Sequence, residues 1–204
     1  MKSRAISFNT VMVQAILNDR KTQTRRPMKP QPESARWDGK RWTLPLGGQC
    51  GHDVPISPYG RIGDELWVRE SARVVGYGAG MGRRNITLKY LADDYLSDWI
   101  RVPHRIKDVK AGHCLSNGCF KEAARIHLII KDVKIELIQD TFDGDMYAEG
   151  TDDWCADYID KHGGGKFCSI RAGFKKMWDS IYSDKGFGWD KNPYVWVIDF
   201  RVKE

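Results

Sequence analysis

The chain has 204 residues, of which 41% are hydrophobic, and it carries a formal net charge of +6. This length and composition suit one domain with elaborations. The sequence contains no run of about 18 apolar residues that would predict a membrane span. Its amino terminus lacks the basic and then apolar pattern of a signal peptide, so we expect a soluble, cytoplasmic protein. The positive charge is compatible with a nucleic acid or a phosphorylated ligand as partner.

The first elements are a strand, a helix and a second strand. Residues 4–8 are β-like, and residues 11–18 predict a helix that Asn9 or Thr10 can cap. The basic segment 21–26, KTQTRR, alternates and is rich in threonine, which predicts a strand that ends at the following prolines.

The next segment predicts further strands. Residues 35–45 are typical of a hairpin with Asp38-Gly39 as its turn. Residues 65–75 and 86–93 read as strands. The glycine-rich residues 76–85 between them predict a flexible loop.

The second half begins with its least regular part, residues 95–121. Residues 125–138 then predict a long strand, and Thr141 is expected to cap a short helix that ends at Glu149. A further helix is expected to begin after Ser169, and residues 194–202 predict the closing strand.

Strands outnumber helices, and strands and helices do not alternate regularly. This order favours an α+β fold, a mixed β-barrel with peripheral helices, over a doubly wound parallel sheet.

Several sequence blocks are distinctive in their order along the chain. They are ILNDRKTQTRRPMKPQP, YGRIGDELWVRE, YLADD, MYAEG, FKKMWDSIY and GWDKNPYVWVIDF. Together these blocks resemble the ASCH domain family, whose members have a PUA-like β-barrel. The phage- and prophage-encoded branch of the family is the most similar. The resemblance implies a single ASCH/PUA-like domain over residues 1–204, with insertions at about 27–60 and 95–121.

The resemblance also implies a function. ASCH members are linked to the binding of RNA or modified nucleosides, and one small bacterial branch is an amidohydrolase that deacetylates N4-acetylcytidine. The functional residues of that branch are a lysine and a threonine in a KTxT segment and a glutamate after the long central strand. In this sequence they correspond to Lys21, Thr24 and Glu149.

These three residue types can form a hydrolytic site. A threonine hydroxyl needs a base to become a nucleophile, and a lysine can be that base when burial or nearby cations depress its pKa. Glutamate can orient the lysine or carry protons. In a continuous strand, however, Lys21 and Thr24 point to opposite faces. A joint site therefore predicts that Lys21 precedes the strand.

Other residues are candidates for contacts with a nucleic acid or nucleoside. They are cations beside the KTQT segment, and charged or aromatic residues of the later strands. The expected ligand-binding residues are Arg20, Arg25, Arg26, Trp67, Arg69, Glu70 and Tyr90. The ordinary alternatives are core aromatic residues and solvent-facing ion pairs.

Cysteines and histidines in two loop segments suggest a possible tetrahedral zinc site. The candidate ligands are Cys50, His52, His113, Cys114 and Cys119. Their spacing is irregular, so no cofactor is expected and a structural zinc is the alternative.

Three functions follow from these observations. The first is a PUA-like binding module for RNA, DNA or a modified nucleoside that uses a basic cleft at residues 21–26. The second is a small-amide hydrolase that acts on an N4-acetylcytidine-like nucleoside. The third is an interaction protein that binds a host factor through exposed tryptophans and performs no chemistry.

Overall fold

The structure, a computed structural model, describes most of the chain as two compact units. The described residues are 1–37, 42–43, 57–80, 83–107, 109–116, 118–152, 154 and 170–204. Unit 1 comprises residues 1–18, 63–129 and 202–204, and unit 2 comprises residues 19–62 and 130–201. No described helix is both long enough and apolar enough to cross a membrane.

Unit 1 begins with a small sheet and one helix. Strand β1 (Ser3–Ser7) pairs in parallel with β5 (Glu65–Arg69), and β5 pairs antiparallel with the first three residues of β10 (His127–Leu137). Helix α1 (Thr10–Leu17) begins after Asn9, whose side-chain oxygen accepts the backbone N–H of Met12 at 2.9 Å. The cap expected at Asn9 or Thr10 is therefore confirmed at Asn9.

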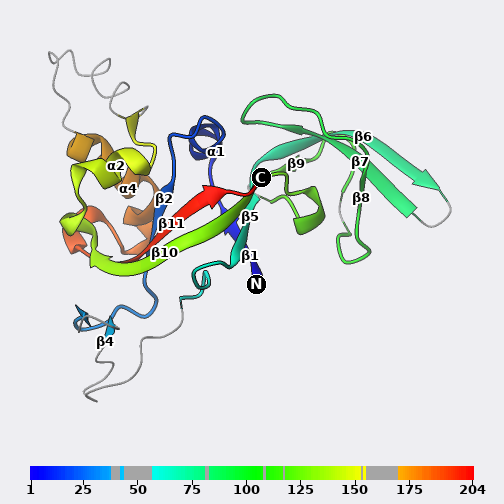
Figure 1. Ribbon diagram of the computed structural model, residues 1–204. Helices are drawn as coiled ribbons and strands as arrows, with labels where there is room; N and C mark the ends of the chain where they lie inside the picture. Colours follow the sequence, from blue (N-terminus) through cyan, green and yellow to red (C-terminus); the bar gives the residue numbers. More distant parts are fainter. Residues whose placement is uncertain are drawn as a thin grey trace, which may run out of the picture. The chain divides into compact units, whose positions relative to one another are not determined.

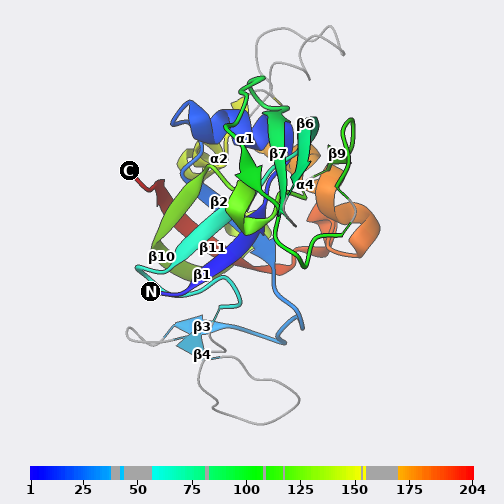
Figure 2. The same cartoon turned by 90° about the vertical axis from the view of Figure 1, so that its right-hand side faces the viewer.

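A second sheet of unit 1 has the strand order β8-β7-β6-β9. These strands are β8 (Ile100–Arg101), β7 (Arg83–Tyr90), β6 (Ala72–Gly80) and β9 (Cys114–Leu115), and Figures 1 and 2 show β6 and β7 side by side. The 3-10 helix η1 (Lys121–Ala123) follows in the chain. Buried apolar side chains, among them Val74, Leu88 and Phe120, form the core of this part.

The structure corrects two expectations about the first half of the chain. The strand expected at residues 65–75 is broken at Glu70, where the buried carboxylate binds Arg125. The glycine loop expected at residues 76–85 is mostly strand, because β6 continues to Gly80. A Cβ at Gly76 would lie 3.0 Å from Thr87 Oγ1 across the pairing, so this glycine permits the close approach of β7.

Unit 2 is built on β10, β11 (Tyr194–Val202) and β2 (Gln23–Pro27), which are neighbours in that order (Figure 1). β11 pairs antiparallel with β2, with Ile198 opposite Thr24. The short strands β3 (Arg36–Trp37) and β4 (Trp42–Thr43) form the expected hairpin. Its expected turn, Asp38-Gly39, lies outside the described residues.

The helices of unit 2 are α2 (Asp143–Ala148) and α4 (Ile170–Tyr182), with the 3-10 helices η2 (Ile138–Asp140), η3 (Ser183–Lys185) and η4 (Trp189–Lys191). α4 buries Phe174, Met177 and Trp178. Phe174 packs edge-on against Trp189, with ring centroids 5.9 Å apart. The described chain has mixed strands and separate helices, which are typical of an α+β fold. The predicted fold class is therefore confirmed.

The start of α2 differs from the expectation. Phe142 precedes the helix, and the described residues provide no side-chain cap there. Thr141 instead donates its hydroxyl to the carbonyl oxygen of Ile138 at 2.8 Å, so the expected Thr141 cap is wrong. At the other end, Gly150 has a φ of 74°, and Glu149 stands immediately after the helix. Ser169, the expected cap of α4, lies outside the described residues.

Candidate active site in unit 2

Lys21 lies just before β2, where it pairs with the end of α2. It forms an isolated antiparallel bridge with Glu149, and the next residue, Thr22, donates its backbone N–H to the carbonyl oxygen of Ala148 at 2.9 Å. β2 begins only at Gln23. Lys21 therefore precedes the strand, as a joint site with Thr24 requires.

The ammonium group of Lys21 is held by three acceptors. Its Nζ lies 2.6 Å from Glu149 Oε2, 2.9 Å from the carbonyl oxygen of Glu149 and 2.9 Å from that of Gln23. A lysine ammonium has three N–H donors, so these contacts use all of them. Lys21 and Glu149 are 1% and 2% exposed. The structure thus brings together two of the three residues that the sequence singled out for catalysis.

Burial makes this lysine unusually acidic. Loss of water around the ammonium lowers the pKa of Lys21 to about 8, although the Glu149 carboxylate favours the charged form. The positive charges of Arg26 and Arg25 add to the lowering. A substantial fraction of Lys21 is therefore neutral at mildly alkaline pH, and a neutral amine can accept a proton.

Arg25 anchors Glu149 from the other side. Its guanidinium donates to Glu136 Oε1 at 2.7 Å, to Asp145 Oδ2 at 3.2 Å and to Glu149 Oε1 at 3.3 Å. Burial opposes the charge of Arg25, but the surrounding carboxylates raise its pKa above the usual value. The two oxygens of Glu149 are thus divided between Lys21 and Arg25. This arrangement fixes the carboxylate in one orientation.

Gln23 extends this network toward β11. Its side-chain oxygen accepts from Arg25, and its amide nitrogen donates to Asp199 and, at 3.4 Å, to Asp145. Gln23 and Arg25 are two residues apart in β2, so their side chains share one face of the strand. Thr24 and Arg26 belong to the opposite face.

Thr24 is 0% exposed, and its hydroxyl has no hydrogen-bond partner among the described residues. Buried hydroxyl groups in folded proteins are nearly always hydrogen-bonded. This group lies three positions after Lys21 and is chemically a potential nucleophile. The Thr24 hydroxyl is therefore buried, close to Lys21 in the sequence, and not hydrogen-bonded by any of the residues that the structure describes.

The remaining cations of this segment have other partners. Arg26 donates to the hydroxyl of Tyr182 at 3.0 Å. Arg20 is half-buried, with its guanidinium 3.8 Å from the Asp152 carboxylate. Lys21 and Arg25 are buried against carboxylates, so phosphate binding by either would require breaking ion pairs.

The other predicted ligand-binding residues belong to unit 1. Glu70 is 1% exposed and accepts two hydrogen bonds from Arg125, at 3.0 and 2.9 Å. Arg125 also binds Asp93 and lies 4.3 Å above the ring centroid of Tyr90. Burial raises the pKa of Glu70, and the paired Arg125 opposes that rise. Arg125 thus contacts both residues: it forms an ion pair with Glu70 and lies against the ring of Tyr90.

Trp67 and Arg69 are half-buried on β5, between the buried Leu66 and Val68. The buried Nε of Arg69 has no hydrogen-bond partner among the described residues. The expected role of Trp67 and Arg69 in ligand binding stays a prediction.

Two of the candidate zinc ligands, Cys50 and His52, lie outside the described residues. Of the others, His113 and Cys114 are exposed, whereas Cys119 is buried in the core of unit 1. Burial raises the pKa of the Cys119 thiol to about 12, which opposes the thiolate form that binds zinc. Within the described part of the chain, no group of three or more His, Cys, Asp or Glu side chains is placed to hold a metal ion.

The sequence prediction missed the partners of Arg25, which are Glu136, Asp145 and Gln23. Two signals were available. Glu136 interrupts an otherwise apolar segment, IELI, at residues 135–138. Asp145 precedes Glu149 by four residues, which places both on one side of a helical turn. Arg125, which binds Glu70, was also missed.

Comparison with known proteins gives one structural neighbour. No family model and no curated protein matches the chain. The structure is similar to the crystal structure of an ASCH domain from Lactobacillus crispatus JV V101, with a TM-score of 0.39 and 11% sequence identity, over 98% of this chain and 79% of that chain.

Proposed function

We propose that the chain hydrolyses a small amide carried by a modified nucleoside, with Lys21, Thr24 and Glu149 as the working residues. The observation that carries this proposal is the buried Lys21, whose pKa is lowered to about 8 and whose Nζ lies 2.6 Å from Glu149. The Thr24 hydroxyl, which has no hydrogen-bond partner in the described part of the chain, supplies a candidate nucleophile. The resemblance to the deacetylating ASCH branch assigns the same three positions and suggests N4-acetylcytidine as the first substrate to test.

The residues divide the chemistry as follows. Neutral Lys21 takes the proton of the Thr24 hydroxyl, and Oγ1 attacks the acyl carbonyl carbon. When the C–N bond breaks, the Lys21 ammonium returns its proton to the leaving amine. Water, deprotonated by Lys21, then attacks the carbonyl carbon of the ester on Thr24. When the C–O bond breaks, Thr24 Oγ1 takes the proton back from the Lys21 ammonium, and the acid is released. Glu149 holds Lys21 in position throughout. Because Lys21 and Thr24 are both buried, the acyl group that reaches them must be small.

Binding of RNA, DNA or an intact nucleoside through the segment 20–26 remains the alternative proposal. The positive net charge of the chain supports an anionic partner. Arg25, however, is engaged by three carboxylates, and Lys21 by one. These contacts support a role for both cations inside the site rather than at a phosphate backbone.

The proposal is tested by incubating the protein with N4-acetylcytidine and measuring cytidine release. We expect turnover by the wild type and a loss of about 10²-fold or more in Thr24→Val, which retains the shape of the side chain but lacks the hydroxyl. Thr22→Val is the matched control, because Thr22 is exposed two positions away. Absence of turnover by the wild type, or equal rates in both variants, would contradict the proposal.

The proposal also predicts a pH dependence. The base must be neutral, so kcat/KM should fall about tenfold per pH unit below the Lys21 pKa of about 8 and level off above it. The measurement is kcat/KM for cytidine release over a pH series. A rate that declines as the pH rises through this range would exclude a neutral lysine as the base.

A further inference from the structure

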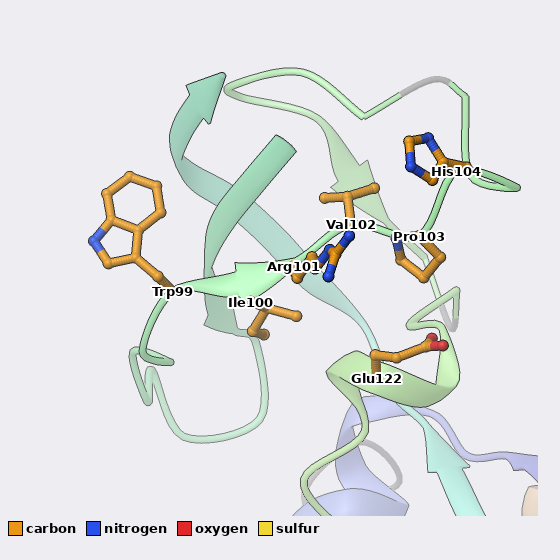
Figure 3. A pocket seen from close by; sticks show the side chains of 7 residues that line it. All are labelled: Trp99, Ile100, Arg101, Val102, Pro103, His104 and Glu122. Carbon is orange, nitrogen blue, oxygen red and sulfur yellow. The ribbon is translucent and has the colours of Figure 1, made fainter. Parts of the chain in front are cut away.

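Unit 1 contains a pocket that the proposed hydrolysis does not use. Its volume is about 550 Å³, and it is formed by one continuous segment around β8 together with one side chain of η1. Figure 3 shows Trp99 at one end of this segment, His104 at the other, and Glu122 rising from η1. The lining residues are Trp99, Ile100, Arg101, Val102, Pro103, His104 and Glu122.

Trp99 is 62% exposed, which is unusual for so large an apolar side chain. Its indole lies over the glycines of β6. A Cβ at Gly78 would be 3.4 Å from Trp99 Cζ3, and a Cβ at Gly76 would be 3.6 Å from Cη2. The strand thus supports the ring where side chains are absent, while most of the indole surface remains accessible to solvent. An accessible, supported ring can stack on a nucleobase.

The segment beyond β8 is held in place by Arg84. Its guanidinium donates to the carbonyl oxygens of Ile106 at 2.6 Å and Lys107 at 3.1 Å, and its own carbonyl oxygen accepts the N–H of Val102 at 2.8 Å. These contacts fix residues 102–107 to β7. The pocket is therefore largely formed before any ligand binds, which lowers the entropy lost on binding.

The charges at the pocket favour an anion. The one carboxylate among the lining side chains, that of Glu122, is paired with Arg105 at 2.6 Å. The guanidinium of Arg101 and the imidazole of His104 are exposed on the lining segment. Lys107 and Lys110 follow, also exposed. An accessible indole beside exposed cations matches a polymer that presents unstacked bases and phosphates.

We propose that this Trp99 pocket binds single-stranded nucleic acid, with a base stacked on Trp99 and a phosphate contacted by Arg101. A single strand fits better than a duplex because its bases are available for stacking. The charged lining favours it over an apolar protein segment, because exposed cations contribute through contacts with phosphates. The site lies in unit 1 and uses none of the residues of the proposed hydrolase site.

The test is fluorescence anisotropy with labelled oligouridylate and oligodeoxythymidylate. Wild-type protein should bind both, and Trp99→Leu should weaken binding about tenfold, while Trp99→Phe retains a ring and loses less. Phe142→Leu is the control for the loss of an exposed ring, because Phe142 is 77% exposed in unit 2. Arg101→Gln should reduce the slope of log affinity against log salt by about 1. Lys131→Gln, which removes an exposed charge in unit 2, is its control.

Two further measurements distinguish single-stranded nucleic acid from other ligands. A duplex of the same length should bind more weakly than the single strand, and a mononucleotide should compete poorly because it offers one base and no neighbouring phosphates. The proposal is overturned if no oligonucleotide binds, if Trp99→Leu and Phe142→Leu bind alike, or if the duplex binds as tightly as the single strand. The deacetylation test measures cytidine release with variants of unit 2, whereas this test measures oligonucleotide binding with variants of unit 1, so the two tests fail independently.

Discussion

Replacing Lys21 by methionine is expected to reduce cytidine release from N4-acetylcytidine by about 10³-fold, because a positioned general base contributes roughly 10²- to 10⁴-fold to the rate. Methionine retains the unbranched apolar stem but has no proton acceptor of comparable strength. The Glu149 carboxylate keeps its contact with Arg25 in this variant, so the fold should survive. The measurement is kcat/KM, with circular dichroism to verify folding.

A second variant distinguishes the role of Lys21 as the base from the role of Glu149, which holds Lys21 in position. Glu149→Gln retains a side-chain oxygen that accepts from Lys21 but removes the negative charge. Because that charge favours the ammonium form, its loss should lower the pKa of Lys21 further and move the rise in kcat/KM to lower pH. A folded Lys21→Met variant with wild-type turnover would contradict the assignment of Lys21.

Replacing Arg25 by methionine is expected to lower the free energy of unfolding by about 3 to 5 kcal/mol, which is the usual effect of removing one partner from a buried ion pair. The change leaves Glu136, Asp145 and Glu149 without the guanidinium that pairs with all three. Urea denaturation at neutral pH measures the loss. Arg4→Met is the control, because Arg4 forms a more exposed pair with Asp64 and should change stability by less than about 1 kcal/mol.

A loss of stability in Arg25→Met no larger than that in Arg4→Met would mean that the pairing of Arg25 with its three carboxylates contributes little to the folded state.

The sequence predicted which helices and strands carry the candidate site better than it predicted the side-chain contacts within the site. The strand after the KTQT segment and the position of Glu149 after a short helix could be inferred from local patterns. The requirement that Lys21 precede the strand came from side-chain alternation alone. Local patterns are informative here because each depends on residues that are near one another in the chain.

The partners of Arg25 could not be inferred in the same way. Glu136 and Glu149 are 111 and 124 positions away from Arg25, and only the sheet order β10-β11-β2 and the placement of α2 bring them to it. A charged residue in a threonine-rich strand indicates exposure when it is read locally. The burial of Arg25 results from carboxylates that are distant in sequence, so composition and periodicity carry no signal for it.

The glycine-rich segment after residue 75 illustrates the opposite error. Its composition predicted a flexible loop, yet β6 continues through it to Gly80. The glycines are explained by close neighbours, Thr87 across the strand pair and the Trp99 ring above it. Neither neighbour can be inferred from the segment itself.

The protonation of Lys21 is the central claim, and NMR can measure it directly without a substrate. A pH titration of protein with isotope-labelled lysine side chains follows the ε-methylene of each lysine, and the Lys21 signal is identified by its absence from Lys21→Met. The structure predicts that this signal titrates near pH 8, where burial places the pKa of Lys21. A Lys21 signal that titrates at or above the usual lysine pKa would contradict its role as a general base.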